Sequence, residues 1–199
     1  MSKNNLKYPI IAISGLKNSG KEEFTKMLQT AYLNKLYDND YNYKTEYHLV
    51  ETFLRNKLEI KYFATPLKQI ASILLSVDID VFNNRKTKEQ YRPYLLKLSD
   101  ILKKDDDERF RRVTRTEINN NPNTTFILED LRLKPEEIMI KELGGYIIGI
   151  ERPDNENSVN HETETTYSSI VKDIIIQNDG TLDDLYLKAV EVIDNLFVR

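Results

Sequence analysis

Apolar and polar residues follow two different patterns along this chain. Five short runs are almost continuously apolar and have the length of a β-strand. We predict strands at 9–14, 59–63, 125–129, 146–151 and 173–177. Nearly continuous apolar runs are typical of parallel strands that helices cover on both faces.

Between these runs, apolar residues recur at the spacing of an amphipathic helix. We predict helices at 22–36, 66–76, 89–104, 107–120, 135–143 and 181–196. Strands that alternate with helices predict a parallel, doubly wound α/β sheet, here of five strands flanked by helices. Ligands of such sheets bind at the carboxyl ends of the strands.

Residues at the ends of the helical segments support these boundaries. Pro66 and Pro135 stand where a helix begins, a position at which the missing N–H costs nothing. Gly144-Gly145 is a helix stop, and Thr181 is an N-cap with Asp184 three residues later.

Two stretches interrupt the alternation. Residues 77–120 are highly charged and contain no strand pattern, so we expect a helical insertion over the binding edge of the sheet. Residues 153–168 are polar and rich in Glu, Asn and Thr, and we expect a mobile lid loop there. We expect residues 1–199 to form one domain.

The strongest chemical signal is the segment Gly15–Lys21, which reads G-x-x-x-x-G-K between a predicted strand and a predicted helix. A glycine-rich turn that runs into a helix N-terminus presents backbone N–H groups to a phosphate, and Lys21 adds a positive charge. The alternative is a chance match in a strand-to-helix turn. The next residue is Glu22, where this motif usually has Ser or Thr to hold Mg²⁺.

A metal-holding acid and phosphate-gripping arginines are the other parts that phosphoryl transfer requires. Asp130, with Glu129 beside it, follows the third predicted strand and is the candidate Mg²⁺ ligand. Arg132 follows two residues later, and Arg152 ends the fourth strand. Guanidinium groups bind phosphates in a bidentate manner.

Other basic residues lie in or near the insertion. Arg92 begins an apolar segment and is a candidate phosphate ligand, whereas the arginines at 109–115 are better explained as a helix face that pairs with 105–107. Lys68 either reaches a substrate phosphate or is an exposed helix lysine. Of the two histidines, His48 is expected on the surface, and His161 could contact nucleotide.

Composition excludes several classes of protein. The chain has no cysteine, which excludes disulfides, thiolate zinc sites and cysteine nucleophiles. Its net charge of −3 argues against a general nucleic-acid binder. No apolar run approaches membrane-spanning length, so we expect a cytoplasmic location.

Taken together, the motifs resemble those of the deoxynucleoside monophosphate kinases of tailed phages and large DNA viruses. The resemblance covers nearly the whole chain, and the family has an acid where Glu22 stands. Its other segments are matched, in chain order, by Ala64–Lys68, Arg92–Lys97, Asp130–Arg132 with Glu136-Glu137, Gly144–Arg152, His161–Glu164 and Asn178–Leu185.

The resemblance implies transfer of the γ-phosphoryl group of ATP to a deoxynucleoside monophosphate, with Mg²⁺ as cofactor. By this resemblance, Glu22 and Asp130 would hold the metal, and Lys21, Arg92, Asp130 and Arg132 would be catalytic. Residues implied on the ATP side are Gly15, Lys17, Asn18, Ser19, Gly20, Lys21, Glu22, Glu23, Arg152, Asn178 and Gly180. Residues implied on the acceptor side are Lys68, Arg92, Arg132, His161 and Glu164.

The chain departs from the family pattern at Glu23, where the family often has Thr, and at Leu98-Ser99-Asp100, where the family has L-G-T. Two other functions stay open. One is a kinase similar to animal phosphomevalonate kinase, and the other is a nucleotide-binding regulatory or scaffolding protein without turnover. The apolar helices of the insertion could form a homodimer contact or cover the active site.

Overall fold

The computed structural model describes residues 8–153 and 167–196. Their contacts divide the chain into two compact units, Tyr62–Asn120 and the remainder of the chain on either side of it. The predicted insertion at 77–120 lies within the smaller unit, which we call the helical unit. The larger one contains the sheet, and we call it the sheet unit.

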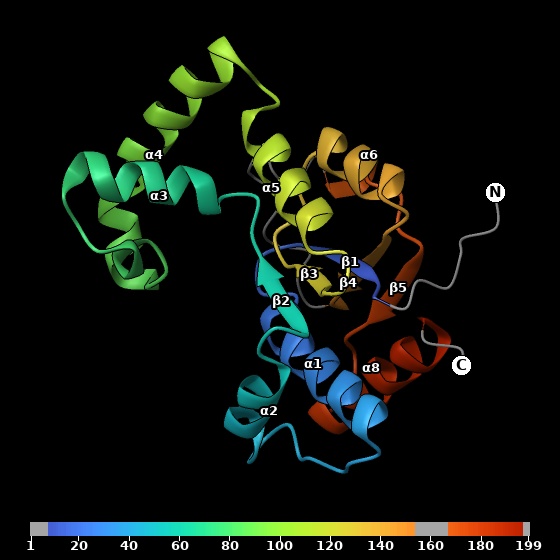
Figure 1. The fold of residues 1–199 in the computed structure, drawn as a ribbon. Coiled ribbons are helices and arrows are strands. Elements are labelled where there is room, and N and C mark those ends of the chain that lie inside the picture. Colours follow the sequence, from blue (N-terminus) through green and yellow to red (C-terminus); the bar gives the residue numbers. More distant parts are fainter. Residues whose placement is uncertain (1–7, 154–166, 197–199) are drawn as a thin grey trace. The chain divides into compact units, whose positions relative to one another are not determined.

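The sheet unit holds a five-stranded parallel sheet in the order β2-β3-β1-β4-β5, which confirms the predicted α/β class (Figure 1). The strands are β1 (Ile10–Gly15), β2 (Leu58–Lys61), β3 (Thr125–Leu128), β4 (Tyr146–Glu151) and β5 (Ile174–Gln177). β1 lies at the centre, and its residues Ile10–Ile13 are buried. The central strand therefore carries the segment that leads into the glycine-rich turn.

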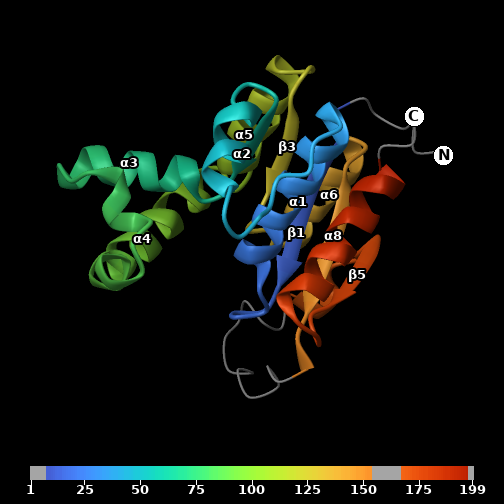
Figure 2. The same cartoon turned by 90° about the horizontal axis from the view of Figure 1, so that it is seen from below.

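Helices cover both faces of this sheet. α1 (Lys21–Tyr37) and α8 (Leu182–Leu196) pack against each other on one face, and α6 (Lys134–Glu142) lies on the opposite face (Figure 2). Apolar side chains of α1, such as Phe24 and Leu28, are fully buried together with Ile148 and Ile150 of β4. This layer fixes the start of α1 against the carboxyl end of β1.

The predicted helix boundaries hold where end signals were present. Gly144 follows α6 with φ of 76°, and its N–H donates to the Lys141 carbonyl. At the start of α8, the Asp184 carboxylate accepts from the Thr181 N–H at 2.8 Å, and the Thr181 hydroxyl accepts from the Asp184 N–H at 3.2 Å. This reciprocal pair confirms Thr181 as the N-cap.

The helical unit contains α3 (Thr65–Leu75), a 3₁₀ turn η1 (Ile79–Phe82), α4 (Arg85–Asp105) and α5 (Arg109–Asn120). Ala71, Phe82 and Leu95 form its own small core. α4 begins four residues before the predicted position 89 and continues through Pro93, although an interior proline removes one helical hydrogen bond. α2 (Tyr47–Leu54) of the sheet unit and η1 were not predicted.

In the described residues, no helix is both long enough and apolar enough to span a lipid bilayer.

Candidate active site

The glycine-rich turn joins β1 to α1, as the sequence predicts. Two of its residues have positive φ, Asn18 at 63° and Gly20 at 96°. Asparagine tolerates the left-handed region better than most residues, and glycine enters it without steric cost. Gly20 is the N-cap of α1, and its carbonyl accepts the first helical hydrogen bond from the Phe24 N–H at 2.9 Å. The turn therefore directs the backbone N–H groups at the N-terminus of α1 toward the loop, where an anion can bind.

The loop is wound tightly enough to exclude side chains at Gly15. A Cβ atom there would lie 2.5 Å from the Ser19 hydroxyl oxygen and 2.8 Å from the Ile150 carbonyl oxygen. The hydroxyls of Ser14 and Ser19 are buried and have no hydrogen-bond partner within the part of the chain that the structure describes. Buried hydroxyls without partners fit a loop that receives a polar ligand such as phosphate.

Lys21, the first residue of α1, folds back over the loop. Its Nζ donates to the carbonyls of Gly15 and Leu16, each at 2.7 Å. Burial and the nearby Arg132 guanidinium lower the pKa of Lys21 to about 8, and the Glu129 carboxylate partly opposes this effect. The Arg132 guanidinium therefore lies near enough to Lys21 for its charge to act on the ammonium group.

Glu129, which the sequence offered only as the neighbour of Asp130, is the acid whose charge reaches the loop lysine. It follows β3 directly, is only 8% exposed, and its charge acts on Lys21. Its charge also acts on Tyr47 of α2, whose pKa is raised by burial and by the charges of Glu51 and Glu129. The Tyr47 hydroxyl in turn donates to the side-chain carbonyl of Gln29. The charge of one buried carboxylate therefore acts on both the loop lysine and a tyrosine of the unpredicted helix.

Asp130, the predicted Mg²⁺ ligand, is the next residue and is half-buried. The Leu131 N–H donates to the Ile13 carbonyl at 3.2 Å, which continues the pairing of β3 with β1 beyond the strand itself. This bond keeps 129–132 beside the phosphate loop.

The Arg132 side chain is exposed, and its backbone is held by Glu136. The Glu136 carboxylate accepts hydrogen bonds from the backbone N–H groups of Arg132 and Leu133, at 2.8 and 2.9 Å. Both oxygens of Glu137 accept from Lys134 at 2.8 Å. Glu136 and Glu137 therefore stabilise the start of α6, and Glu136 also holds the backbone that carries Arg132.

The first turn of α1 carries the two unusual acids. Glu22 is exposed, and Glu23 lies 3.7 Å from Lys26. Carboxylates in the first turn of a helix interact favourably with its dipole. No three carboxylate or imidazole groups converge on a metal position anywhere in 8–153 or 167–196.

Asn178 is the predicted ATP-side residue that contacts the loop directly. Its side-chain Nδ2 donates to the Ser19 carbonyl at 2.9 Å. Gly180 packs against Asp184 at the start of α8. Lys17 and Arg152 are exposed. His161 and Glu164 lie outside the described residues, as does most of the expected lid loop.

In the helical unit, Lys68 is 9% exposed, so the expectation of an exposed helix lysine is wrong. Its Nζ donates to Asn83 at 2.9 Å and lies 5.3 Å from the centre of the Tyr62 ring. The Arg92 guanidinium makes two 2.8 Å hydrogen bonds to the Glu89 carboxylate.

The arginines of α5 form the ion pairs that the sequence suggests. Arg109, Arg111 and Arg112 pair with Asp105, Asp107 and Asp106, respectively. His48 is exposed, as predicted.

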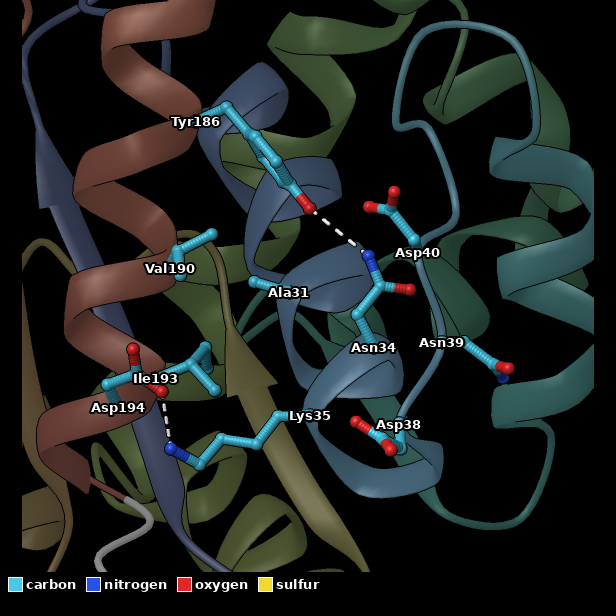
Figure 3. Close-up of a pocket in the computed structure, with 10 residues that line it drawn as sticks. All are labelled: Ala31, Asn34, Lys35, Asp38, Asn39, Asp40, Tyr186, Val190, Ile193 and Asp194. Atoms are coloured by element: carbon cyan, nitrogen blue, oxygen red, sulfur yellow. Dashed lines mark hydrogen bonds and ion pairs between the residues drawn. The ribbon is translucent and has the colours of Figure 1, made fainter.

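A separate pocket of about 610 Å³ lies at the far end of α1. Figure 3 shows Asn34 bonded to Tyr186 of α8, and the ion pair between Lys35 and Asp194. None of the predicted site residues lines this pocket. Since α1 spans 17 residues, its two ends are about 25 Å apart, so the pocket is not part of the phosphate loop.

Comparison with known proteins points to one family. The family model described as deoxynucleotide monophosphate kinase matches residues 103–189. A protein of Acanthamoeba polyphaga mimivirus, named "Putative deoxynucleotide monophosphate kinase", is 30% identical to the chain over 159 residues. The alignment covers 68% of this chain and 82% of the viral protein.

Proposed function

The chain belongs to the deoxynucleotide monophosphate kinase family, and we propose that it transfers the γ-phosphoryl group of ATP to a deoxynucleoside monophosphate. The bond from the γ-phosphorus to its bridging oxygen breaks, and a bond to an acceptor phosphate oxygen forms, giving the deoxynucleoside diphosphate and ADP. The observation that supports this proposal is the glycine loop at the N-terminus of α1, over which Lys21 folds back and where the charge of Arg132 acts on Lys21. Two cations at a helix N-terminus suit a group that carries several negative charges.

On the donor side, the loop residues Lys17 to Glu23 would surround the ATP phosphates, with Gly15 keeping the turn tight. Lys21 exchanges its backbone carbonyl partners for phosphate oxygens. Arg152, Asn178 and Gly180 are proposed to lie on the nucleotide side of the loop.

Mg²⁺ suits this donor set, because it binds through one or two carboxylates together with substrate phosphates. Glu22 and Asp130 are the residues that would hold it. When bound, the metal neutralises charge on the phosphates. Glu129 is already engaged by its surroundings and is proposed to tune Lys21 instead.

On the acceptor side, Arg92, Arg132 and Lys68 would hold the monophosphate or the group in transfer. His161 and Glu164 belong to the same proposal by resemblance. The acceptor phosphate is ionised at neutral pH, so the reaction needs no strong general base. Charge neutralisation by these cations is therefore the chemistry that the chain has to supply.

The test is ADP release from ATP and Mg²⁺ with separate deoxynucleoside monophosphates, ribonucleoside monophosphates and phosphomevalonate. We expect turnover with one or more deoxynucleotides. Lys21→Ala is expected to reduce kcat by about 10²-fold or more, as removal of a transition-state charge contact does.

Each other outcome has a definite meaning. Turnover with phosphomevalonate alone would replace the nucleotide acceptor by that substrate. Tight ATP binding without acceptor-dependent turnover would leave a non-catalytic nucleotide-binding protein. A cytoplasmic location, the absence of nucleic-acid partners and a homodimer remain predictions that this assay does not address.

A further inference from the structure

Asn178 joins the end of β5 to the middle of the phosphate loop. Its Nδ2 donates to the Ser19 carbonyl at 2.9 Å. Its own backbone N–H donates to the Glu151 carbonyl at 2.7 Å, so the residue is fixed to β4. The loop is therefore tied at Ser19 to the rigid sheet, across 159 positions of sequence.

The contact between Asn178 and the loop leaves no room for a side chain at Gly20. A Cβ atom on Gly20 would lie 2.5 Å from the Asn178 Nδ2, and the φ of Gly20 is 96°. Glycine is thus required at position 20 on two grounds, its backbone conformation and the amide that lies against it. The Ser19–Gly20 peptide lies directly beside the Asn178 side chain.

The orientation of that peptide determines where a phosphate donor points. No peptide bond is cis in the described residues, and the C=O and N–H of a trans peptide point in opposite directions. Holding the Ser19 carbonyl toward Asn178 directs the Gly20 N–H to the opposite side of the peptide. Gly20 is the N-cap of α1, where N–H groups lack intrahelical partners and can bind an anion.

We propose that Asn178 is a positioning residue, which holds the Ser19–Gly20 peptide so that the Gly20 N–H is presented to a bound phosphate. This inference rests on the proposed function, because it assumes that the loop binds the phosphates of a nucleotide. It differs from a role in lining the adenine site, since here Asn178 acts through the loop and recognises no part of the base.

The two roles predict different ligand dependence. A positioning residue affects every ligand that uses the loop, with or without a base. A base contact affects only ligands that carry adenine. Inorganic tripolyphosphate has the phosphates of ATP without the nucleoside, so comparing the two ligands separates the roles.

The experiment measures the Kd of ATP and of tripolyphosphate by calorimetry for the wild type, Asn178→Ala and Asn178→Asp. In the alanine variant we expect the affinity for both ligands to fall by the same factor, about tenfold. The aspartate side chain has nearly the same shape but cannot donate to the Ser19 carbonyl. Asn178→Asp should therefore reduce the affinity for both ligands at least as much as Asn178→Ala does. Gln177→Ala is the matched control, because Gln177 precedes Asn178 and bonds Glu151 instead of the loop.

If Asn178→Ala unfolds below the assay temperature, Asn178→Asp provides the test in its place. Circular dichroism checks that each protein is folded. Weaker ATP binding with unchanged tripolyphosphate binding would overturn the inference in favour of a base contact. Unchanged affinity for both ligands in both variants would overturn it outright. A wild-type protein that binds neither ligand would instead remove the proposed function on which the inference depends.

Discussion

The Lys21 ammonium donates to the carbonyl of Gly15 at 2.7 Å, so the loop lysine is bonded to the loop that it closes. A second bond of the same length reaches the Leu16 carbonyl. These carbonyls hold the ammonium over the loop before any ligand is present. A phosphate must replace them, and the protonation of Lys21 therefore bears directly on ligand affinity.

The affinity for ATP is expected to fall as the pH rises through about 8, the pKa to which burial, and then Arg132, lower Lys21. Above that pH the free protein loses the charge that the phosphates require. ATP itself is already fully ionised there, since the last phosphate pKa is roughly 6 to 7. Calorimetry from pH 7 to 9.5 should show a loss of up to about tenfold per pH unit at the alkaline end.

Lys21→Arg is the control for this titration, because guanidinium stays protonated throughout the range. If the ATP affinity of the wild type changed with pH in the same way as that of Lys21→Arg, the prediction would be contradicted.

The free energy of unfolding should also depend on the protonation of Lys21. The lowered pKa determines whether that free energy rises or falls with pH. Above about pH 8 the folded protein releases this proton, whereas the unfolded chain keeps it up to its ordinary value of 10.5. The unfolded state then binds more protons, so this group makes the free energy of unfolding rise with pH within that window. Below pH 8 both states are protonated, and the cost of burying the charge is fully present.

Urea unfolding of the wild type and of Lys21→Met, at pH 7 and at pH 9.5, measures this contribution. We expect the methionine variant to be more stable relative to wild type at pH 7 than at pH 9.5. An equal difference at both pH values would show that Lys21 keeps its ordinary pKa.

Glu129 and Arg132 should move the Lys21 titration in opposite directions. Removing the negative charge by Glu129→Gln is expected to lower the pKa of Lys21 further, and removing the positive charge by Arg132→Met is expected to raise it. The midpoint of the pH dependence of ATP affinity is the readout, because it is independent of how much affinity each variant loses. Shifts in the same direction for both variants would contradict this arrangement of charges.

The sheet and the phosphate loop could be predicted because their signals are local. Continuous apolar runs specified the strands, and Gly15, Gly20 and Lys21 specified the turn. α2 was missed because it has only eight residues, too short for the helical spacing of Leu49, Val50, Phe53 and Leu54 to stand out. Contacts with α1, remote in sequence, fix this helix: Val50 and Leu54 are buried in the main core, and Tyr47 bonds Gln29.

The choice between Glu129 and Asp130 could not be made from sequence, because it depends on the residue at which β3 ends. The predicted strand included Glu129, whereas the observed strand stops at Leu128. Side chains alternate along a strand, so the residue at which β3 ends determines how the two acids that follow are placed. The contact between Asn178 and Ser19 was beyond prediction for a similar reason, since it depends on the order of strands in the sheet.

Arg92 is expected to serve the acceptor. Its pairing with Glu89 is an exposed contact, worth at most about 1 kcal/mol, so a substrate phosphate can compete for the guanidinium. Arg92→Lys should raise the KM for the deoxynucleoside monophosphate several-fold and leave the KM for ATP unchanged, because lysine keeps the charge but not the bidentate geometry. Glu89→Gln is the companion variant and should not raise the acceptor KM. An increase in the KM for ATP alone would place Arg92 on the donor side.

Glu136 should contribute to stability through the backbone that carries Arg132. Its carboxylate accepts from two consecutive N–H groups, those of Arg132 and Leu133, at the start of α6. Glu136→Ala leaves both donors without this acceptor and should reduce the free energy of unfolding by about 1 to 3 kcal/mol. Glu136→Gln retains an acceptor oxygen, so it should reduce the free energy of unfolding by less than half as much as Glu136→Ala does. Urea unfolding measures both values. Because Arg132 moves with this backbone, the alanine variant should also lower kcat more than the glutamine variant does. Equal stability of the two variants would mean that the capping bonds contribute nothing, and that the burial of Glu136 has another cause.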